Sequence, residues 1–385
     1  MSVPKKSARA IIALLICALV ITCAGISKVG AAPSNIAAPA LSASSAVLID
    51  ALTSDILIEK NAHSRMAMAS TTKIMTALVA AENGELDRAV SVHPSATGVE
   101  GSSIYLFAGE KLTLRDLICA MLLESANDAA AAIAIEIGGS IEGFCAMMNE
   151  KAEELGLRDT NFKNPHGLYD EEHYTTAYEL AKITREALKN EDIKAIVATK
   201  KMTIKPIEGN ARVLRNHNKM LSFYEGAIGV KTGFTKKSGR CLVSAAERDG
   251  LTLIAVTINA PDDWNDHQKL LDAGFENFEA LPLTKAGKVC YMLDVMGGDA
   301  ANVALVYRDT LSATVRKGGS KEIRCVIETY NRYEFAPVKS GKTMGRALFY
   351  LDGEKIGEVD LVCATDVNFK KSDESLFSKI KNIFT

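Results

Sequence analysis

Ser70 and Lys73 stand one helical turn apart at the beginning of an apolar segment. Residues 65–84, RMAMASTTKIMTALVAAENG, predict a helix with small polar residues at its start and apolar residues beyond. A buried ammonium is unfavourable unless it is paired or neutral, and a neutral lysine is a base. Residues i and i+3 share one face of a helix. The spacing therefore predicts a serine nucleophile with Lys73 as its base.

Ser125 and Asn127 interrupt a second apolar stretch, LLESANDAAAA, which we predict to be helical over residues 113–137. Thr113 is the expected N-cap of this helix, and a Gly-Gly pair marks its end. The two polar side chains either belong to a site or lie at a solvated edge or kink of the helix.

Lys231, Thr232 and Gly233 lie in the predicted strand GAIGVKTGFT. A glycine in a strand lets a ligand or another chain approach closely, and the neighbouring ammonium and hydroxyl suit an anion. Each short motif has competitors, because Ser-x-x-Lys occurs three times and Lys-Ser-Gly twice. Only the Ser70 copy opens an apolar helix in the main part of the chain, and only the Lys231 copy follows an apolar strand.

The composition is that of a globular protein with room for one large and one small domain: 385 residues, 48% hydrophobic and 24% charged. Residues 1–32 hold four basic residues and no acidic one, so the formal charge of −2 becomes −6 for residues 33–385. No basic face is indicated, and we expect no nucleic acid as a partner.

Residues 1–32 have the layout of a secretory signal peptide, with basic residues before the apolar run AIIALLICALVITCAGI and small residues after it. The run is also about as long as a short membrane span, so an uncleaved anchor is the alternative. Cys23 hints at a lipoprotein site, for which Thr22 is a poor neighbour. We expect an exported protein.

The six cysteines after residue 32 are widely spread, without a C-x-x-C or a zinc spacing. We interpret most of them as small buried apolar residues, although an exported protein permits disulfides. The six histidines form no H-x-H or H-E-x-x-H pattern, and no G-x-S-x-G occurs. The sequence therefore favours neither a metal site nor a Ser-His-Asp hydrolase, and His166 is interpreted as a loop-packing residue.

The order of elements predicts an α+β fold with an antiparallel sheet rather than a βαβ series. Residues 45–62 predict a β-hairpin, and three successive strands follow residue 226, the last two joined by Asp249-Gly250. Between them, and after the strands, further helices are predicted over residues 140–157, 176–190 and 266–281.

Residues 283–366 alternate short apolar runs with turns, which predicts a small all-β domain without chemistry of its own. Residues 367–385 end in DESLFSKIKNIFT, where five apolar residues share one helical face and lysines flank it. Such a basic amphipathic helix either lies in a membrane interface or docks on the β domain.

The three polar motifs, taken together and in this order, resemble those of penicillin-binding proteins and serine β-lactamases. Their separations of 55 and 106 residues are similar to those of the low-molecular-mass D-alanyl-D-alanine carboxypeptidases. The hairpin before Ser70, the NPHGL loop, the β domain and the amphipathic tail extend the resemblance over essentially the whole chain.

The resemblance implies a serine DD-peptidase domain of the β-lactamase and penicillin-binding-protein type at residues 33–282. It implies removal of the terminal D-alanine from the stem pentapeptide of peptidoglycan, without a metal or an organic cofactor. It also implies β-lactam antibiotics as inhibitors and a peripheral location on the outer face of the cytoplasmic membrane.

The roles of the site residues follow from the same resemblance. Ser70 is acylated, Lys73 takes its proton, and Ser125 relays a proton to the departing D-alanine. Lys231 lies near the serines, adds a positive field and helps to keep Lys73 neutral. In the second motif, Asn127 is expected to bind the substrate by a hydrogen bond to its amide.

The third motif supplies the other expected substrate contacts. Thr232 binds the terminal carboxylate, and Gly233 leaves room for the substrate. Backbone N–H groups of Ser70 and Phe234 form the oxyanion hole. Some relatives carry a basic residue shortly after the third strand, but APDDWNDHQKLL is acidic until Lys269. Carboxylate binding is therefore expected to depend more on Thr232 and the lysine before it.

Three alternatives use the same residues. An endopeptidase would cut peptidoglycan crosslinks, a β-lactamase would need a deacylating glutamate, and a penicillin-reactive protein would only bind. The polar loop NFKNPHGLYDEEHYTT offers Glu171 and Glu172, in no arrangement typical of such a base. All motif residues are present, which argues against lost catalysis.

Overall fold

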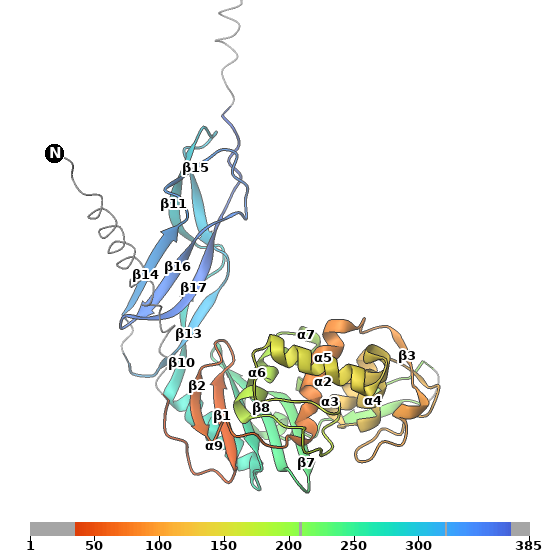
Figure 1. Cartoon of the computed structure of the whole chain (residues 1–385). Helices are drawn as coiled ribbons and strands as arrows, with labels where there is room; N and C mark the ends of the chain where they lie inside the picture. Colours follow the sequence, from red (N-terminus) through yellow and green to blue (C-terminus); the bar gives the residue numbers. More distant parts are fainter. Residues whose placement is uncertain (1–34, 208–209, 320–321, 371–385) are drawn as a thin grey trace, which may run out of the picture. The chain divides into compact units, whose positions relative to one another are not determined.

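The computed structural model describes residues 35–207, 210–319 and 322–370 (Figure 1). Within this part the chain forms two compact units. The N-terminal unit comprises residues up to Leu281 together with Thr314–Gly319, and the C-terminal unit comprises Pro282–Ala313 and the described residues after 321. The predicted signal peptide lies outside the described residues, as does the predicted tail beyond residue 370.

The N-terminal unit alternates strands with helices and two short 3-10 turns, η1 and η2. Its elements are β1 (Ser45–Asp50), β2 (Ile56–Lys60), η1 (Ala69–Thr72), α2 (Lys73–Asn83), β3 (Ala89–Ser91), η2 (Pro94–Ala96), β4 (Lys111–Thr113), α3 (Leu114–Leu123), α4 (Asn127–Gly138), α5 (Ile141–Glu154), α6 (Ala177–Leu188), α7 (Glu191–Ala198), β5 (Lys201–Ile204), β6 (Arg212–Arg215), α8 (Met220–Phe223), β7 (Ala227–Thr235), β8 (Gly239–Arg248), β9 (Leu251–Ile258) and α9 (Asp263–Asn277).

An antiparallel five-stranded sheet with the order β2-β1-β9-β8-β7 forms the centre of this unit. The predicted hairpin at 45–62 and the three predicted strands after residue 226 are confirmed as its members. Asp249 and Gly250, which join β8 to β9, both have positive φ, as a tight two-residue hairpin turn requires. The predicted α+β class is confirmed.

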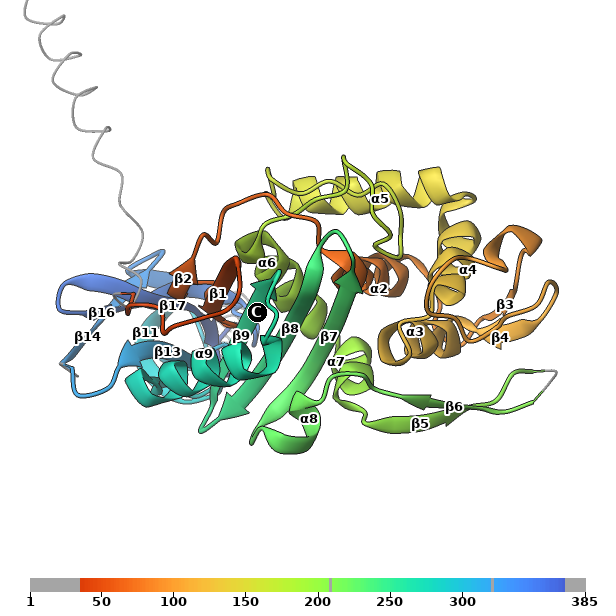
Figure 2. The same ribbon diagram turned by 90° about the horizontal axis from the view of Figure 1, so that it is seen from below.

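Helices cover both faces of this sheet, as Figure 2 shows for α9 on one side and α2 and α6 on the other. The alternation along β1 explains the two layers, because successive side chains of a strand point to opposite faces. Val47 and Ile49 pack with the cluster of helices from α2 to α7. Leu48 packs instead with Leu271 and Phe275 of α9. Both faces are therefore buried, and every residue of β1 is buried.

Two predicted helices differ from the structure. The helix predicted over 113–137 is two helices, α3 and α4, and the chain between them turns at Ser125, whose φ is 61°. The predicted cap at Thr113 is confirmed, since its hydroxyl accepts from the N–H of Asp116 at 3.0 Å. The helix predicted over 266–281 ends at Asn277, because the next residue begins the strand β10 (Phe278–Thr284), which pairs with β13 (Leu311–Arg316).

The C-terminal unit contains strands only among its described elements, as predicted. These are β11 (Val289–Met296), β12 (Asn302–Tyr307), β14 (Ile323–Thr329), β15 (Tyr333–Phe335), β16 (Thr343–Leu351) and β17 (Glu354–Cys363), while β10 (Phe278–Thr284) and β13 (Leu311–Arg316) cross the unit boundaries. The first six form a sheet with the order β14-β16-β17-β12-β11-β15, and β10 and β13 form a separate two-stranded sheet. Leu305 and Leu361 of the six-stranded sheet belong to the hydrophobic core of this unit.

The described residues contain neither a disulfide nor a single helix that could span a membrane. All six cysteines of the described residues are unpaired, and four are buried, as expected for small apolar side chains. In the described part of the chain, no single helix is long and apolar enough to cross a membrane. The bent pair α4 and α5 reaches the necessary length and apolarity only when the two helices are taken together.

Asp266 of α9 holds the segment that precedes β1, and its removal is expected to destabilise the N-terminal unit. Its buried carboxylate accepts from the N–H and hydroxyl of Ser42 at 2.9 and 2.7 Å and from the N–H of Ala43 at 2.8 Å. Asp266→Ala leaves these donors unsatisfied, so we expect a loss of about 1–3 kcal/mol in the free energy of unfolding by urea. Asp262→Ala removes an exposed carboxylate of the same helix start and serves as the control. Equal losses in both variants would contradict the prediction.

Candidate active site

Ser70 lies in the tight turn η1, three residues before Lys73, the first residue of α2. The hydroxyls of Thr71 and Thr72 donate to the carbonyls of Met68 and Ala69 at 2.6 and 2.8 Å. These bonds satisfy carbonyls that precede the helix and hold the turn. The turn keeps Ser70 partly exposed at the end of a buried helix.

Lys73, the first residue of α2, is completely buried and surrounded by oxygen atoms. Its Nζ lies 3.0 Å from Ser70 Oγ, 2.6 Å from Asn127 Oδ1 and 2.7 Å from the carbonyl oxygen of His166. The nucleophile and base predicted from the sequence are therefore within hydrogen-bonding distance of each other.

The contacts of Lys73 determine the direction of the hydrogen bond to Ser70 when the lysine is neutral. A neutral amine has two N–H donors and one lone pair. The amide oxygen of Asn127 and the carbonyl of His166 can only accept, so they take the two N–H groups. The lone pair then faces the hydroxyl of Ser70, which donates to it. This is the arrangement that a general base requires.

Three charged or titratable groups from different elements face Lys73. Burial is the main cause that lowers the pKa of Lys73 far below its usual value, and the charge of Lys231 lowers this pKa further. Asp128 of α4 acts in the opposite direction. His166 is itself held neutral, because burial lowers its pKa to about 3. The electrostatic setting therefore favours neutral Lys73.

The NPHGL loop, residues 164–168, closes over the turn that carries Ser70. The hydroxyl of Thr76 donates to the carbonyl of Pro165 at 2.6 Å. Gly167 has a φ of 89°, and a Cβ at this position would lie 1.9 Å from the carbonyl oxygen of Ala69. Only a glycine fits at this position. Because Gly167 has no side chain, the loop can lie close enough to the turn for the carbonyl of His166 to contact Lys73.

Strand β7 brings the third motif against the same turn. A Cβ on Gly233 would lie 3.0 Å from the backbone nitrogen of Ser70, so the strand passes close to this N–H. Lys231 is buried, its Nζ donates to the carbonyl of Thr232 at 2.9 Å, and burial lowers its pKa to about 7. Thr232 is partly exposed beside it, whereas Phe234 exposes 65% of its surface.

Ser125 and Asn127 flank the break between α3 and α4. The left-handed backbone of Ser125 ends the first helix, and such a conformation in a residue with a side chain is found where the surrounding structure enforces it. Both side chains are buried. Asn127, expected to bind the substrate amide, is already bonded to Lys73 through its amide oxygen.

Two features of the site were missed in the sequence. The third partner of Lys73 is a backbone carbonyl, which any residue type at position 166 would supply. Arg240 of β8 is the cross-strand partner of Phe234, so a cation does lie beside the third motif, and it donates to Asp263 at 2.8 Å. Among the described residues, no cluster of His, Cys, Asp or Glu is arranged to hold a metal ion.

Residues 32–262, which include all three motifs, match the family described as D-alanyl-D-alanine carboxypeptidase, Peptidase S11. The chain belongs to this family. Residues 278–368 match the C-terminal domain of penicillin-binding protein 5. The predicted family and the serine-hydrolase class, a D-Ala-D-Ala carboxypeptidase of the penicillin-binding-protein type, are therefore confirmed.

Individual relatives resemble the carboxypeptidase along most of its length. The D-alanyl-D-alanine carboxypeptidase DacF of Bacillus subtilis is 34% identical over 84% of this chain and 86% of its own. DacA of Haemophilus influenzae is 30% identical over 90% of this chain and 92% of its own. The solved structure of penicillin-binding protein 5 from the same species superposes with a TM-score of 0.69, at 30% identity, over 87% of this chain and all of that one.

Loss of Lys231 is expected to move the pH dependence of the carboxypeptidase. A lysine base works when it is neutral, so with Lys73 as the predicted base we expect the rate of acylation by a penicillin to rise with pH as Lys73 loses its proton. In Lys231→Gln the repulsion that lowers the pKa of Lys73 is absent. We expect the acid limb of the residual acylation rate to move to higher pH, by on the order of one unit. Lys201→Gln, at an exposed lysine of β5, is the control, and a limb that stays in place would contradict the prediction.

Proposed function

We propose that this carboxypeptidase removes the terminal D-alanine of the stem pentapeptide through an acyl-enzyme on Ser70. The observation that carries the proposal is the 3.0 Å contact between Ser70 Oγ and a buried Lys73 whose two other partners are acceptors. Such a lysine is neutral and receives the proton of the hydroxyl as the oxygen attacks the carbonyl between the two D-alanines.

The remaining motif residues act on the developing charges. The negative oxygen of the tetrahedral intermediate binds the N–H groups of Ser70 and Phe234, because β7 passes the N–H of Ser70 at Gly233. Ser125 passes a proton to the nitrogen of the departing D-alanine. A water molecule then attacks the ester carbonyl, and Ser70 leaves with a proton.

Binding of the substrate uses the third motif and the amide of Asn127. Thr232 donates its hydroxyl to the terminal carboxylate, and buried Lys231 supplies the positive field. Approach of an anion raises the pKa of Lys231 from about 7 and keeps its charge. Asn127 Nδ2 carries two N–H groups, of which one donates to the carbonyl of Glu100, and the second serves the substrate amide.

The alternatives have less support. Glu171 and Glu172, the glutamates of the polar loop, are exposed, and Glu172 Oε2 pairs with Lys163 at 3.0 Å. This is not the environment of a buried deacylating base, so a β-lactamase is not favoured. An endopeptidase uses the same chemistry on a crosslinked dimer, and no observation favours it over the carboxypeptidase.

The function is tested by the release of D-alanine from a pentapeptide ending in D-Ala-D-Ala. We expect release by the wild type and none by Ser70→Ala, because the nucleophile is lost. Ser222→Ala is the matched control, since it removes an exposed serine hydroxyl in α8, away from the turn that carries Ser70. A wild type that releases no D-alanine but is acylated by penicillin at Ser70 would contradict the substrate and direct attention to crosslinked dimers.

We also propose that the chain is exported by residues 1–32, with the peptidase domain at 33–282 and the β domain at 283–366. The basic and apolar layout of the first segment supports export. The tail 367–385 holds the protein at the outer face of the membrane, because its apolar face is flanked by lysines that attract anionic lipids.

The tail is tested with the protein lacking residues 1–32 and with vesicles of anionic lipid. Phe377→Asp places a charge on the apolar face and is expected to abolish co-sedimentation, whereas Ser378→Asp on the opposite face reduces it less. Protein that also lacks residues 371–385, and so keeps the buried Val367 of the β unit, serves as the reference. If this truncated protein still sediments with vesicles, the tail is not the anchor.

A further inference from the structure

A loop that we call the strap, residues 100–110, connects η2 with β4 and crosses the beginning of α4. Two of its backbone carbonyls accept hydrogen bonds from Asn127. The carbonyl of Glu100 accepts from Asn127 Nδ2 at 2.5 Å, and the carbonyl of Ser102 accepts from the backbone N–H of Asn127 at 2.7 Å. The strap therefore contacts the same side chain that contacts Lys73.

The bond to Glu100 determines which way the amide of Asn127 faces. With Nδ2 directed at the Glu100 carbonyl, Oδ1 is directed at Lys73, 2.6 Å away. The reversed amide would place its oxygen against the carbonyl of Glu100, which is repulsive, and it would place an N–H donor against Lys73, where it competes with Ser70 for the lone pair. The position of the strap thus decides whether Lys73 has the acceptor that orients its lone pair toward Ser70.

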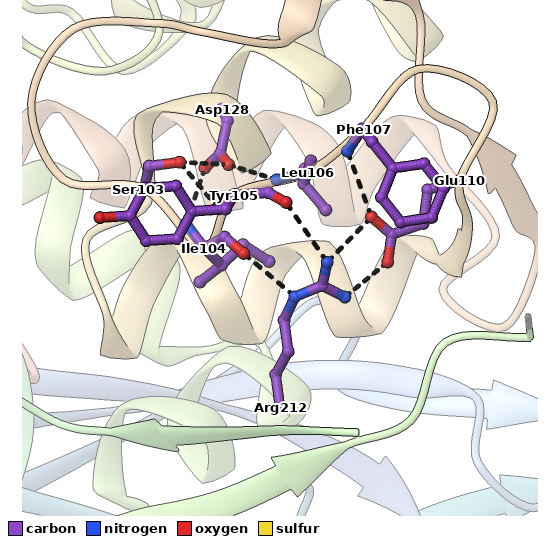
Figure 3. Close-up of polar contacts among 8 residues, drawn as sticks. All are labelled: Ser103, Ile104, Tyr105, Leu106, Phe107, Glu110, Asp128 and Arg212. Atoms are coloured by element: carbon purple, nitrogen blue, oxygen red, sulfur yellow. Dashed lines mark hydrogen bonds and ion pairs between the residues drawn. The ribbon is translucent and has the colours of Figure 1, made fainter. Parts of the chain in front are cut away.

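Asp128, the next residue of α4, binds the middle of the strap. Its buried carboxylate accepts from the hydroxyl of Ser103 at 2.6 Å and from the N–H groups of Ile104 and Leu106 at 3.3 and 3.0 Å (Figure 3). The sequence offered no reason to single out this aspartate. Its bonds fix the strap to the start of the helix that carries Asn127.

Arg212 of β6 binds the far end of the strap from a hairpin that lies about a hundred residues later in the sequence. Figure 3 shows its guanidinium between the carbonyls of Ile104 and Tyr105 and the carboxylate of Glu110. Nε donates to the carbonyl of Ile104 at 3.0 Å, and both terminal nitrogens bind the two carboxylate oxygens of Glu110.

The burial of Glu110 makes its ion pair with Arg212 important for the stability of the strap. Its side chain is only 1% exposed, so its charge depends on the paired cation. Removing one partner of a buried ion pair leaves an uncompensated charge, which draws in water or displaces the segment that carries it. Glu110 also receives the N–H of Phe107 at 3.3 Å, so a displaced carboxylate would release the strap backbone as well.

We propose that Arg212 is a positioning residue of the peptidase. By binding Glu110 and the carbonyls of Ile104 and Tyr105, it holds the strap in the place from which Glu100 and Ser102 orient Asn127 toward Lys73. Arg212 acts on the base through three layers of contacts and touches neither Ser70 nor Lys73. The inference rests on the roles proposed above for these two residues.

The test is the rate of acylation by a fluorescent penicillin across pH, with the site of attachment read by mass spectrometry. Arg212→Met keeps the length of the side chain and removes the donors. We expect acylation about 10- to 100-fold slower than in the wild type, because a small displacement of catalytic groups has effects of this size. We also expect the acid limb to move to higher pH, because water admitted by a loosened strap reduces the burial that keeps Lys73 neutral.

Arg115→Met is the matched control for a loss of ion pairs alone. Arg115 belongs to the same unit and binds Asp87 and Asp192, and none of these residues contacts the strap. We expect this variant to change the unfolding midpoint without changing the acylation rate or its acid limb. Arg212→Lys supplies a charge to Glu110 but not the planar fork, and we expect it to restore part of the rate.

A second variant keeps the inference open to refutation if Arg212→Met folds poorly. Arg212→Met combined with Glu110→Gln removes the unpaired buried carboxylate and is expected to fold, yet it still lacks the contacts to the strap carbonyls. Slow acylation and a shifted acid limb in this folded double variant would support the inference. A wild-type rate and an unchanged limb would overturn it, and a wild type that is not acylated at Ser70 would overturn the proposed function with it.

Discussion

The burial of two lysines in the same site is the constraint on which the rest of this candidate active site depends. Lys73 and Lys231 are both removed from water, and a buried ammonium is unfavourable next to another. The charge of Lys231 helps to lower the pKa of Lys73, and Lys73 is the lysine that lies 3.0 Å from the hydroxyl of Ser70. The proposed chemistry therefore depends on packing, because the sheet and the helices must keep water away from the two lysines.

Several unusual local conformations serve this burial. Ser125 has a left-handed backbone, Gly167 approaches a carbonyl at a distance that no side chain would allow, and Gly233 passes close to the N–H of Ser70. Each brings a separate segment into the same small volume. The stable framework that tolerates these conformations is the five-stranded sheet, which is buried on both faces.

The sequence predicted the architecture well where patterns were local. The hairpin before Ser70, the Asp249-Gly250 turn and the cap at Thr113 each follow from a few adjacent residues. The break at Ser125 was predicted only as an alternative, a kink in one helix, because the run AAAAIAI at residues 129–135 continues an ordinary helical pattern. The strand β10 was missed because Phe278 continues the apolar pattern of α9, and only pairing with β13 decides its conformation.

The site was predictable as a set of residue types and much less as a set of contacts. The conflict between a lysine and an apolar helix pointed to Lys73 and Ser70. The carbonyl of His166 carries no sequence signal, since every residue has one. Arg212 and Glu110 are distant in sequence and belong to no motif, so only the fold reveals that they are partners.

The order of strands in the central sheet has a consequence for how the protein matures. β1, near the start of the chain, lies between β2 and β9, and Ser45 is the partner of Ile258. The sheet therefore cannot close until about two thirds of the chain is available, and the lysines cannot be buried before then. In a partly folded chain the lysine that we propose as the base is still in water. Under the proposed mechanism, covalent capture of a penicillin therefore also reports completed folding, and it distinguishes folded molecules from trapped intermediates in the same sample.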